Sequence, residues 1–417
     1  MSFPRYPKYK DSGVEWLGEV PEHWDVKRLR YVSNVRKGRL PSVTSPAPTA
    51  DTDLPYLSME FLRGEVDNPS YVPVSENLLR AESGDLLLLW DGSNAGEFLR
   101  AKQGVVSSTL ALIEARNIEK EFLFFSCKAR ERQLKDQTVG MGIPHVSGDE
   151  LRSFLIPCPA RAEQTQIAAF LDRETAKIDE LVAEQQRLIE LLKEKRQAVI
   201  SHAVTKGLNP KASMKPSGIE WLGDIPAHWR IIPLRWSSRC CSGDGLSSEE
   251  VESLEDERHI VRVIGGNGLL GYTMLGNIEH AVLAVGRVGA LCGNVHIVNR
   301  PAWITDNALI LDPAADVFEL QFLSFVLRSR DLNNIASKTA QPLITGSQVS
   351  DQRMPAPPLS EQREIAVVLS LEITKFDTLT AEAQRAIDLL QERRTALISA
   401  AVTGQIDVRS ALKRDAA

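Results

Sequence analysis

The sequence predicts an α+β protein in which two globular domains of mixed α/β structure are separated by two long helices that form an antiparallel coiled coil. Two internal repeats support this prediction. The stretch SGVEWLGEVPEHW at 12–24 returns as SGIEWLGDIPAHW at 217–229, with nine of thirteen positions identical. A longer segment at 163–205 returns at 361–403 with more than half of its positions identical. The chain is one frame used twice, a pseudo-two-fold internal repeat.

Length and composition are those of a multidomain globular protein. A chain of 417 residues exceeds one ordinary core, and about 150 residues per domain predict two or three units. The apolar fraction of 43% and charged fraction of 25% are typical of globular proteins. No window approaches the roughly 20 apolar residues of a membrane span, and the first residues lack the apolar core of a secretory signal. We expect a cytoplasmic protein without a membrane partner.

The cysteines indicate reduced thiols and no metal site. They are five in number, and no CxxC pair or Cys/His cluster has the spacing of tetrahedral ligands.

The net charge of −6 seems unfavourable for a nucleic-acid partner, which needs basic residues facing phosphates. One acidic stretch, EEVESLEDE at 249–257, holds six carboxylates and no basic residue, so the remainder of the chain is neutral. Composition therefore permits DNA binding without indicating it.

The longer repeat predicts two helices of about 42 residues, roughly 60 Å each. Prolines precede both segments, Gly207 and Gly404 close them, and neither has an internal Gly or Pro. Apolar residues in the first segment step by 4, 7, 3, 7, 4 and 7, and the second segment repeats them in register, which predicts a heptad seam. The seam residues are Ile167, Leu171, Ile178, Leu181, Leu188, Leu192 and Val199, then Ile365, Leu369, Phe376, Leu379, Ala386, Leu390 and Leu397.

The two seams fit each other, so we expect them to be buried together with a domain at either end of the helical pair. The alternative is two unrelated surface helices, each packed on its own domain. Val182, Ile189 and Ile200 lie beyond the seam. On the outer faces they would make the isolated chain poorly soluble.

Strand and turn signals fill residues 25–155, the first insert, and 230–353, the second insert. Apolar runs such as LLLLW and AVLAVG alternate there with Gly, Pro, Asn and Asp, and the two inserts scarcely resemble each other. The predicted organisation is a first domain with its EWLG/PEHW motif, a central long helix, a second domain with the second motif, and a distal long helix with a C-terminal tail. Their ranges are 1–155, 156–208, 209–353 and 354–417.

The motif EWLGEVPEHW, the helix starts IPCPARAEQTQIAAFL and MPAPPLSEQREIAVVL, and the tails AVISHAVTKGL and ALISAAVTGQI resemble the specificity subunit of type I restriction-modification systems. The resemblance covers essentially the whole chain. It implies that the inserts are target-recognition domains, each reading one half of a split site in double-stranded DNA. It also implies that the long helices dock two adenine methyltransferase subunits, which restriction subunits (translocase/nuclease) can join. The chain itself would be non-catalytic and hold no cofactor, with S-adenosylmethionine bound by the methyltransferase subunits.

Physical reasoning supports the same function. Two binding domains held by rigid helices fix the distance between half-sites, as dimer geometry does at about 34 Å per DNA turn. Because the inserts differ, the two half-sites should differ, and the site should be asymmetric with a fixed gap.

Two other functions remain open. One is a protein-interaction scaffold that kept the fold but lost DNA reading. The other is a nicotinamide-dependent enzyme built on Gly266, Gly268 and Gly271, which have GxGxxG spacing after the strand-like 260–264. The residues that follow alternate like a strand and offer no helix N-terminus to a pyrophosphate. A methyltransferase motif and a Walker phosphate loop are missing from the sequence.

The shorter repeat has two tryptophans in each copy, Trp16 with Trp24 and Trp221 with Trp229, which we expect to anchor each domain against the helices. For His23 and His228 we expect a structural role. Base readout favours Arg, Lys, Asn and Gln from loops, with Ser and Thr in support. The candidate DNA contacts are Arg36, Lys37, Arg39, Ser93, Asn94 and Thr109 in the first insert and Asn267, Arg287, Asn294 and Gln341 in the second.

Overall fold

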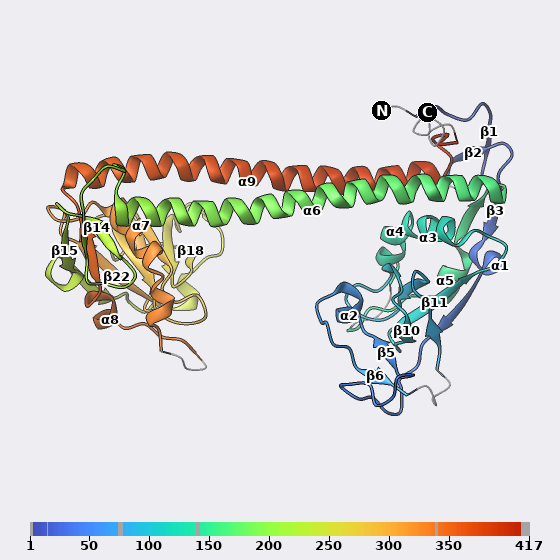
Figure 1. The fold of residues 1–417 in the computed structure, drawn as a ribbon, viewed down its shortest axis with the longest axis horizontal. Helices are drawn as coiled ribbons and strands as arrows, with labels where there is room; N and C mark the ends of the chain where they lie inside the picture. Colours follow the sequence, from blue (N-terminus) through green and yellow to red (C-terminus); the bar gives the residue numbers. More distant parts are fainter. Residues whose placement is uncertain (1–2, 15, 74–77, 139–141, 338–340, 410–417) are drawn as a thin grey trace. The chain divides into compact units, whose positions relative to one another are not determined.

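The computed structural model describes residues 3–14, 16–73, 78–138, 142–337 and 341–409. The chain folds as two compact units (Figure 1). The first unit combines residues 1–185 with 385–417, and the second unit comprises residues 186–384. Each unit therefore contains one copy of the tryptophan motif, one insert and part of each long helix.

Both long repeats form single unbroken helices, as the sequence predicts. Helix α6 spans Arg161–Lys206 with 46 residues, and α9 spans Leu359–Val402 with 44. Gly207 and Gly404 follow them with φ of 75° each, the left-handed conformation in which glycine commonly terminates a helix.

Within each unit the two long helices pack antiparallel. In the first unit Leu171, near the start of α6, shares a core with Val402 at the end of α9. In the second unit Val204, near the end of α6, shares a core with Ile365 at the start of α9. The expected coiled-coil pairing is therefore present in each unit.

One ion pair crosses the helix pair at equivalent positions of each unit. Asp179 Oδ1 lies 2.9 Å from Arg394 Nε in the first unit, and Arg196 Nη2 lies 3.5 Å from Asp377 Oδ1 in the second. The repeat offset of 198 residues relates Asp179 to Asp377 and Arg196 to Arg394. The internal repeat thus extends to the contacts between the helices.

The predicted seam is wrong by one residue in the middle of the helices. Leu181, Leu188 and Leu379 are 44%, 42% and 47% exposed, whereas Ile189 and Ile200, which we expected on the outer face, are 9% and 6% exposed. Val182, also expected outside, is half-buried. The remaining predicted seam positions are buried or half-buried.

Heptad spacing alone does not separate the two seams. Inward-facing positions of a coiled coil alternate steps of three and four residues, and both the predicted and the observed positions of α6 do so. Both seams contain Ile178, Gln185 and Leu192, and they differ only in whether the three-residue or the four-residue step comes first. The inward positions in the middle of the helices are Ile178, Val182, Gln185, Ile189 and Leu192 in α6 and Phe376, Thr380, Ala383, Ile387 and Leu390 in α9.

The first insert contains two four-stranded sheets. One is antiparallel with the order β4-β11-β8-β9, and the other has the order β6-β5-β10-β7 with β5 parallel to β10. Strand β8 is the predicted LLLLW run: Leu86 and Leu88 face the core that α3 and the long helices share, while Leu87 and Leu89 face a second core between the sheets. Burial on both faces explains why this strand is uninterruptedly apolar. The strand bounds are β4 Ser33–Lys37, β5 Leu54–Leu57, β6 Tyr71–Val72, β7 Arg80–Ala81, β8 Leu86–Leu89, β9 Phe98–Arg100, β10 Gly104–Val106 and β11 Leu110–Ala115.

The second insert repeats this arrangement although its sequence is different. Its antiparallel sheet has the order β16-β22-β19-β20, and a three-stranded sheet β18-β17-β21 has β17 parallel to β21. Strand β19 again divides its side chains between two cores. Sequence dissimilarity therefore does not mean two folds. The bounds are β16 Ser238–Ser242, β17 Val261–Gly265, β18 Gly268–Thr273, β19 Val282–Gly286, β20 Val295–Val298, β21 Ala302–Ile304 and β22 Ala308–Pro313.

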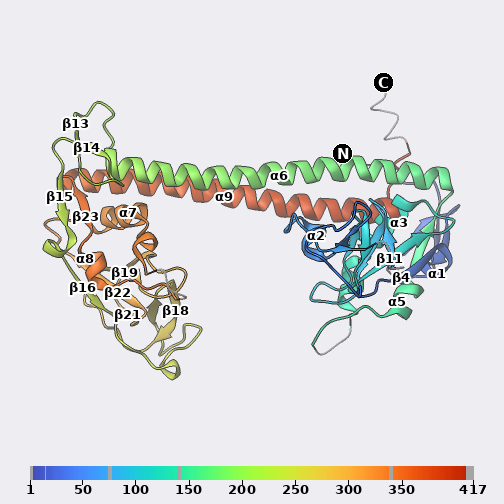
Figure 2. The same cartoon turned by 60° about the horizontal axis from the view of Figure 1, so that its bottom comes forward.

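One helix in each insert lies between the antiparallel sheet and the long helices: α3 (Lys120–Lys128) in the first unit and α7 (Leu320–Arg330) in the second (Figures 1 and 2). Short two-stranded pairs join the inserts to the frame, β1-β2 and β12-β3 in the first unit and β13-β14 and β15-β23 in the second. The remaining bounds are β1 Tyr9–Asp11, β2 Glu19–Pro21, β3 Asp25–Arg28, α1 Leu29–Val32, α2 Met59–Arg63, α4 Glu131–Asp136, α5 Gly148–Ser153, β12 Leu155–Cys158, β13 Met214–Pro216, β14 Asp224–Pro226, β15 Arg230–Pro233, η1 Leu234–Trp236, η2 Ser248–Glu250, η3 Leu332–Ile335, α8 Gly346–Ser350 and β23 Arg353–Ala356.

The second tryptophan of each motif packs against the end of a long helix. Trp24 and Trp229 are fully buried. A Cβ added at Gly404 would lie 3.1 Å from Trp24, and one added at Gly207 would lie 3.2 Å from Trp229. Glycine therefore lets each indole reach the helix terminus.

The first tryptophan of each motif faces the insert. The guanidinium of Arg130, which follows α3, lies 4.3 Å from the ring centre of Trp16, and that of Arg330 in α7 lies 5.7 Å from the ring centre of Trp221. Each motif therefore joins one helix end to one insert, as expected.

The histidines of the motifs bind the first turn of a long helix. His23 Nε2 lies 2.9 Å from Glu163, and His228 Nε2 lies 2.8 Å from Glu361. The structural role expected for both histidines is confirmed by these contacts.

Candidate nucleic-acid interface

Three candidate residues of the first insert line one cavity of about 420 Å³. Ser93 and Asn94 belong to the loop between β8 and β9, and Thr109 immediately precedes β11. All three are exposed. Thr109 is held in place because its carbonyl accepts a hydrogen bond from the amide of Trp90 at 2.8 Å and its hydroxyl lies 3.0 Å from that of Ser107.

The basic candidates near this cavity differ in how much charge they leave free. Lys37 Nζ is 2.6 Å from Asp91, another residue lining the cavity. Arg36 pairs with Glu114, which also accepts from Asn34 at 3.0 Å. Arg39 is exposed beyond the end of β4 and has no ion-pair partner in the described part of the chain. Of the three, Arg39 has the most available charge.

Two candidates of the second insert contact each other. Asn267 occupies the tip of the β17-β18 hairpin, and Asn294 Nδ2 donates a hydrogen bond to its Oδ1 at 2.9 Å. The glycine-rich segment is therefore a tight hairpin, followed by strand β18. The helix N-terminus that binds a pyrophosphate in a dinucleotide site is replaced here by a strand.

Arg287 is directed toward the strand ends of the antiparallel sheet. Its Nη1 donates to Ser242 Oγ at 3.2 Å and to the carbonyl of Asp306 at 3.5 Å, and its Nε is buried without a hydrogen-bond partner among the described residues. Gln341 is exposed and directly precedes Pro342, whose carbonyl accepts from the amide of Gly289 at 3.0 Å. The backbone therefore joins the segment of Gln341 to the loop after Arg287.

The loops that carry Asn94 and Asn294 are equivalent. Gly96 donates to the carbonyl of Leu89 at 2.8 Å in the first insert, and Gly293 donates to that of Gly286 at 2.7 Å in the second. The amides of Trp90 and Arg287 donate to the carbonyls of Thr109 and Asn307, respectively. The two loops are thus equivalent parts of a shared fold, in which Asn94 corresponds to Leu291 and Asn294 corresponds to Glu97.

This equivalence identifies a residue that the sequence analysis missed. Asn307 is exposed and occupies the position of Thr109 in the second insert. The available signal was the spacing Gly-x-x-Ala-Gly at 92–96 and Gly-x-x-Cys-Gly at 289–293, which would have aligned the two inserts. Arg63 and Tyr56, which also line the first cavity, had no signal in the sequence.

Among the described residues, no group of three or more His, Cys, Asp or Glu side chains is placed to hold a metal ion. All five cysteines are free. In the described ranges, the helices are too short or too polar to cross a membrane.

The sequence model of the type I restriction modification DNA specificity domain matches residues 21–191 and 270–388, well over half of the chain. The chain belongs to this family. The first insert, the last two-thirds of the second insert and about the first two-thirds of each long helix fall within the match.

Relatives and solved structures agree with this assignment. The chain is 28% identical to the type I restriction enzyme MjaVIII specificity subunit of Methanocaldococcus jannaschii, covering 96% of this chain and 98% of that protein. It is 26% identical to the EcoprrI specificity subunit of Escherichia coli, covering 88% of each. A chain from a structural study of complex assembly and conformational transition of the type I R-M system has the same fold, with a TM-score of 0.70 at 18% identity, covering 92% of this chain and 98% of that one.

Proposed function

We propose that this protein is a DNA-reading subunit that recognises an asymmetric, bipartite site in double-stranded DNA, one half-site per insert. The observation that carries the proposal is the pair of equivalent loops at 89–97 and 286–294, which share their backbone hydrogen bonds and differ in their side chains. A fixed backbone with exchangeable polar side chains suits the recognition of different bases by one fold, since specificity resides in donors and acceptors directed at base edges.

The side chains at equivalent positions support different half-sites. Thr109 corresponds to Asn307, and Lys37 corresponds to Ser242, because these two residues pair with equivalent positions of the central strand. A cation and a hydroxyl favour different groups in the major groove. The two inserts should therefore read different sequences.

The long helices offer surfaces for two copies of a partner. Leu181 and Leu379 occupy equivalent positions of α6 and α9, as do Leu191 and Leu389, and all four are at least 44% exposed. Each unit has one of these leucines from each helix. Apolar residues exposed in this repeated manner favour protein contacts. We assign the surfaces to two adenine methyltransferase subunits, which bind S-adenosylmethionine and which restriction subunits can join.

In this assignment the chain is a non-catalytic, cytoplasmic recognition subunit. Phosphate contacts should supply much of its affinity and make binding dependent on salt, while base contacts select the site. The competing function is a scaffold that has lost DNA reading. Sequence-selective retardation of duplex DNA by the assembled complex would exclude that function.

Sequencing N6-methyladenine across the host genome, with this gene intact and deleted, tests the proposal. We expect one asymmetric, gapped motif to lose methylation on both strands in the deletion strain. Unchanged methylation in a strain that expresses the protein would contradict the proposal and favour the scaffold.

A further inference from the structure

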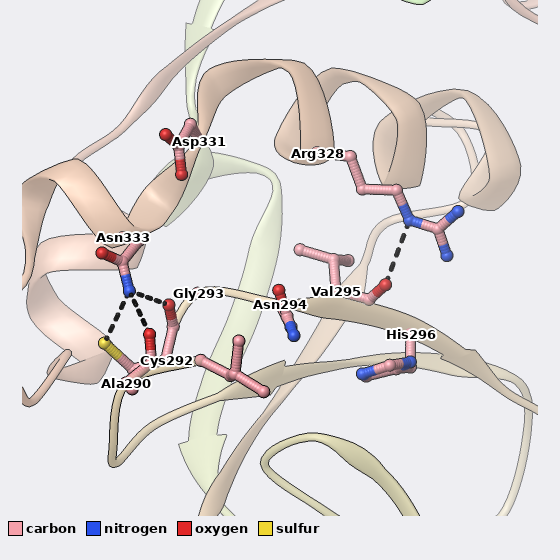
Figure 3. A pocket seen from close by; sticks show the side chains of 10 residues that line it. Ala290, Cys292, Gly293, Asn294, Val295, His296, Arg328, Asp331 and Asn333 are labelled. Carbon is pink, nitrogen blue, oxygen red and sulfur yellow. Dashed lines mark hydrogen bonds between the residues drawn. The ribbon is translucent and has the colours of Figure 1, made fainter. Parts of the chain in front are cut away.

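A second cavity, of about 510 Å³, lies in the second unit between the loop that leads into β20 and the C-terminal end of α7 (Figure 3). Asn333 fixes one wall, since its Nδ2 donates to the carbonyls of Ala290 at 3.1 Å and Cys292 at 2.9 Å. Arg328 and His296 form the opposite wall (Figure 3).

The cavity contains a guanidinium that forms no ion pair with a carboxylate of the described residues, although Asp331 also lines the cavity. Arg328 Nε donates to the carbonyl of Val295 at 3.1 Å, which holds the side chain over the strand, and no ion pair forms between Arg328 and any described carboxylate. Arg328 remains accessible to solvent. Partial burial of its side chain and the nearby charge of Arg196 lower the pKa of Arg328. His296 Nε2 is shielded from solvent and has no hydrogen-bond partner among the described residues.

Arg196 of α6 lies near enough to affect the charge of Arg328, although it is outside the cavity lining and also pairs with Asp377. Its Nε is buried without a hydrogen-bond partner in the described part of the chain, and its nearest carboxylate oxygen, on Asp377, is 3.5 Å from Nη2. Besides burial, the positive charge of Arg196 lowers the pKa of Arg328, and an anion beside the two guanidinium groups would relieve this repulsion.

The first insert shows what an equivalent position looks like when it is neutralised. Helices α3 and α7 begin at equivalent residues, because the amides of Glu119 and Glu319 donate to the side-chain carbonyls of Gln164 and Gln362, respectively. The equivalence places Lys128 at the position of Arg328.

Lys128 is paired with a carboxylate that Arg328 does not have. Lys128 Nζ lies 2.6 Å from Glu131, which also accepts from the amide of Phe98 at 3.0 Å and pairs with Lys135 at 2.9 Å. The counterpart of Glu131 is Asp331, whose φ is 51° and whose carboxylate accepts from Asn334 instead. The second insert therefore keeps the cation and redirects the internal carboxylate.

We propose that the Arg328–His296 cavity binds a phosphate group. A guanidinium presents parallel donors that match phosphate oxygens, and Asn294, a candidate for base reading, lines the same cavity. The phosphate comes from the DNA backbone beside the second half-site or from free phosphate. The DNA source rests on the proposed function, whereas the free-phosphate source does not.

The first arm of the test uses inorganic phosphate. The full-length chain, purified with whatever subunits accompany it, is melted in phosphate and in chloride at equal ionic strength. A bound anion stabilises the folded state, so we expect the melting temperature to rise by about 2–4 °C in phosphate. Arg328→Gln should abolish this rise, whereas Arg353→Gln, which removes an equal charge from an exposed position of β23, should keep it.

The second arm uses duplex DNA that contains the site. The logarithm of the binding constant falls as the logarithm of the salt concentration rises, and removing one cation that binds a DNA phosphate should make this negative slope shallower by about 0.9. We expect Arg328→Gln to make the slope shallower by about this amount and Arg353→Gln to leave it unchanged. His296→Gln serves as a second variant if Arg328→Gln does not fold, as judged by its melting in chloride.

A response in the DNA arm identifies the backbone as the source, and a response in the phosphate arm alone identifies free phosphate. Folded variants that match the wild type in both arms overturn the proposal. If the wild-type complex binds no DNA, the proposed function fails and the phosphate arm still decides the cavity.

Discussion

Residues 89–97 of the first insert and 286–294 of the second close the same loop, yet few of their side chains agree. Gly92 and Gly289 correspond, as do Gly96 and Gly293, and each pair makes the same backbone hydrogen bonds. The two loops carry different polar side chains between and around these glycines. The frame is therefore specified by glycine positions and by strands that are apolar on both faces, which leaves the remaining loop positions available for specificity.

The largest expected effect is a loss of folding stability when either buried tryptophan is replaced. Trp24→Ala or Trp229→Ala should cost about 3–5 kcal/mol, because each removes a fully buried indole. Trp229 Nε1 also donates to Glu361 at 3.0 Å, whereas Trp24 Nε1 is buried without a partner among the described residues.

Replacement by phenylalanine keeps an aromatic ring at each position and isolates the contribution of the hydrogen bond that Trp229 makes. Trp229→Phe should cost about 1 kcal/mol more than Trp24→Phe, since only the former loses a hydrogen bond. Urea unfolding of the four variants measures both effects. Equal costs for the two phenylalanine variants would contradict the assigned hydrogen bond.

The next effect tests the corrected helix seam. Ile189→Ala should cost about 2–4 kcal/mol because Ile189 is buried between the helices. Replacing its neighbour Leu188, which is 42% exposed, by alanine should lower the free energy of unfolding by less than about 1 kcal/mol. If Leu188→Ala cost more stability than Ile189→Ala in denaturant unfolding, the result would contradict the observed seam and support the predicted one.

Base recognition should change by a smaller amount and in one half-site at a time. Asn307→Ala should remove about 1–3 kcal/mol of discrimination at one position of the half-site read by the second insert. Thr109→Ala should act on the other half-site only. Competition binding with duplexes altered in either half measures the discrimination, and a variant that changes both halves would contradict separate reading.

The smallest effect concerns the carboxylate that only the first insert keeps paired. Burial would raise the pKa of Glu131, but Lys128, the amide of Phe98 and Lys135 outweigh it, so the pKa lies below its usual value. Such a carboxylate stabilises the fold above its unfolded pKa of about 4.3, and this contribution is lost as the pH falls through the lower, folded pKa.

The corresponding variants separate the two inserts by pH. Glu131→Gln should cost about 1 kcal/mol at pH 7 and progressively less below about pH 4. Asp331→Asn should change stability little at either pH, because the Asp331 carboxylate accepts from the neutral Asn334 and forms no ion pair among the described residues. Unfolding curves at pH 7 and pH 3.5 give both values. A constant cost for Glu131→Gln would mean that charge pairing is not its cause.

The long helices and the junctions were predictable from the sequence because each follows from a repeat. Prolines, glycines and paired tryptophans mark their ends twice at nearly constant spacing. The exact seam was not predictable, since leucine and isoleucine are adjacent at 188–189 and only packing decides which one faces inward.

Less of the inserts than of the long helices could be predicted from the sequence. Strands β8 and β19 were visible as apolar runs, but their common topology was hidden because backbone hydrogen bonds, which carry it, leave little trace in side chains. Asn307 was missed for this reason. The cation at Arg328 was likewise missed, because the sequence does not show that the carboxylate of Asp331 accepts from Asn334 where its counterpart Glu131 pairs with Lys128.

We propose that each insert reads its own half of one asymmetric site. The most direct test sequences N6-methyladenine genome-wide in strains carrying Asn94→Ala or Asn294→Ala, each compared with the wild type. We expect one gapped motif. Asn94→Ala alone should relax the half read by the first insert, and Asn294→Ala alone should relax the other half. Relaxation of the same half by both variants, or of neither by either, would contradict it.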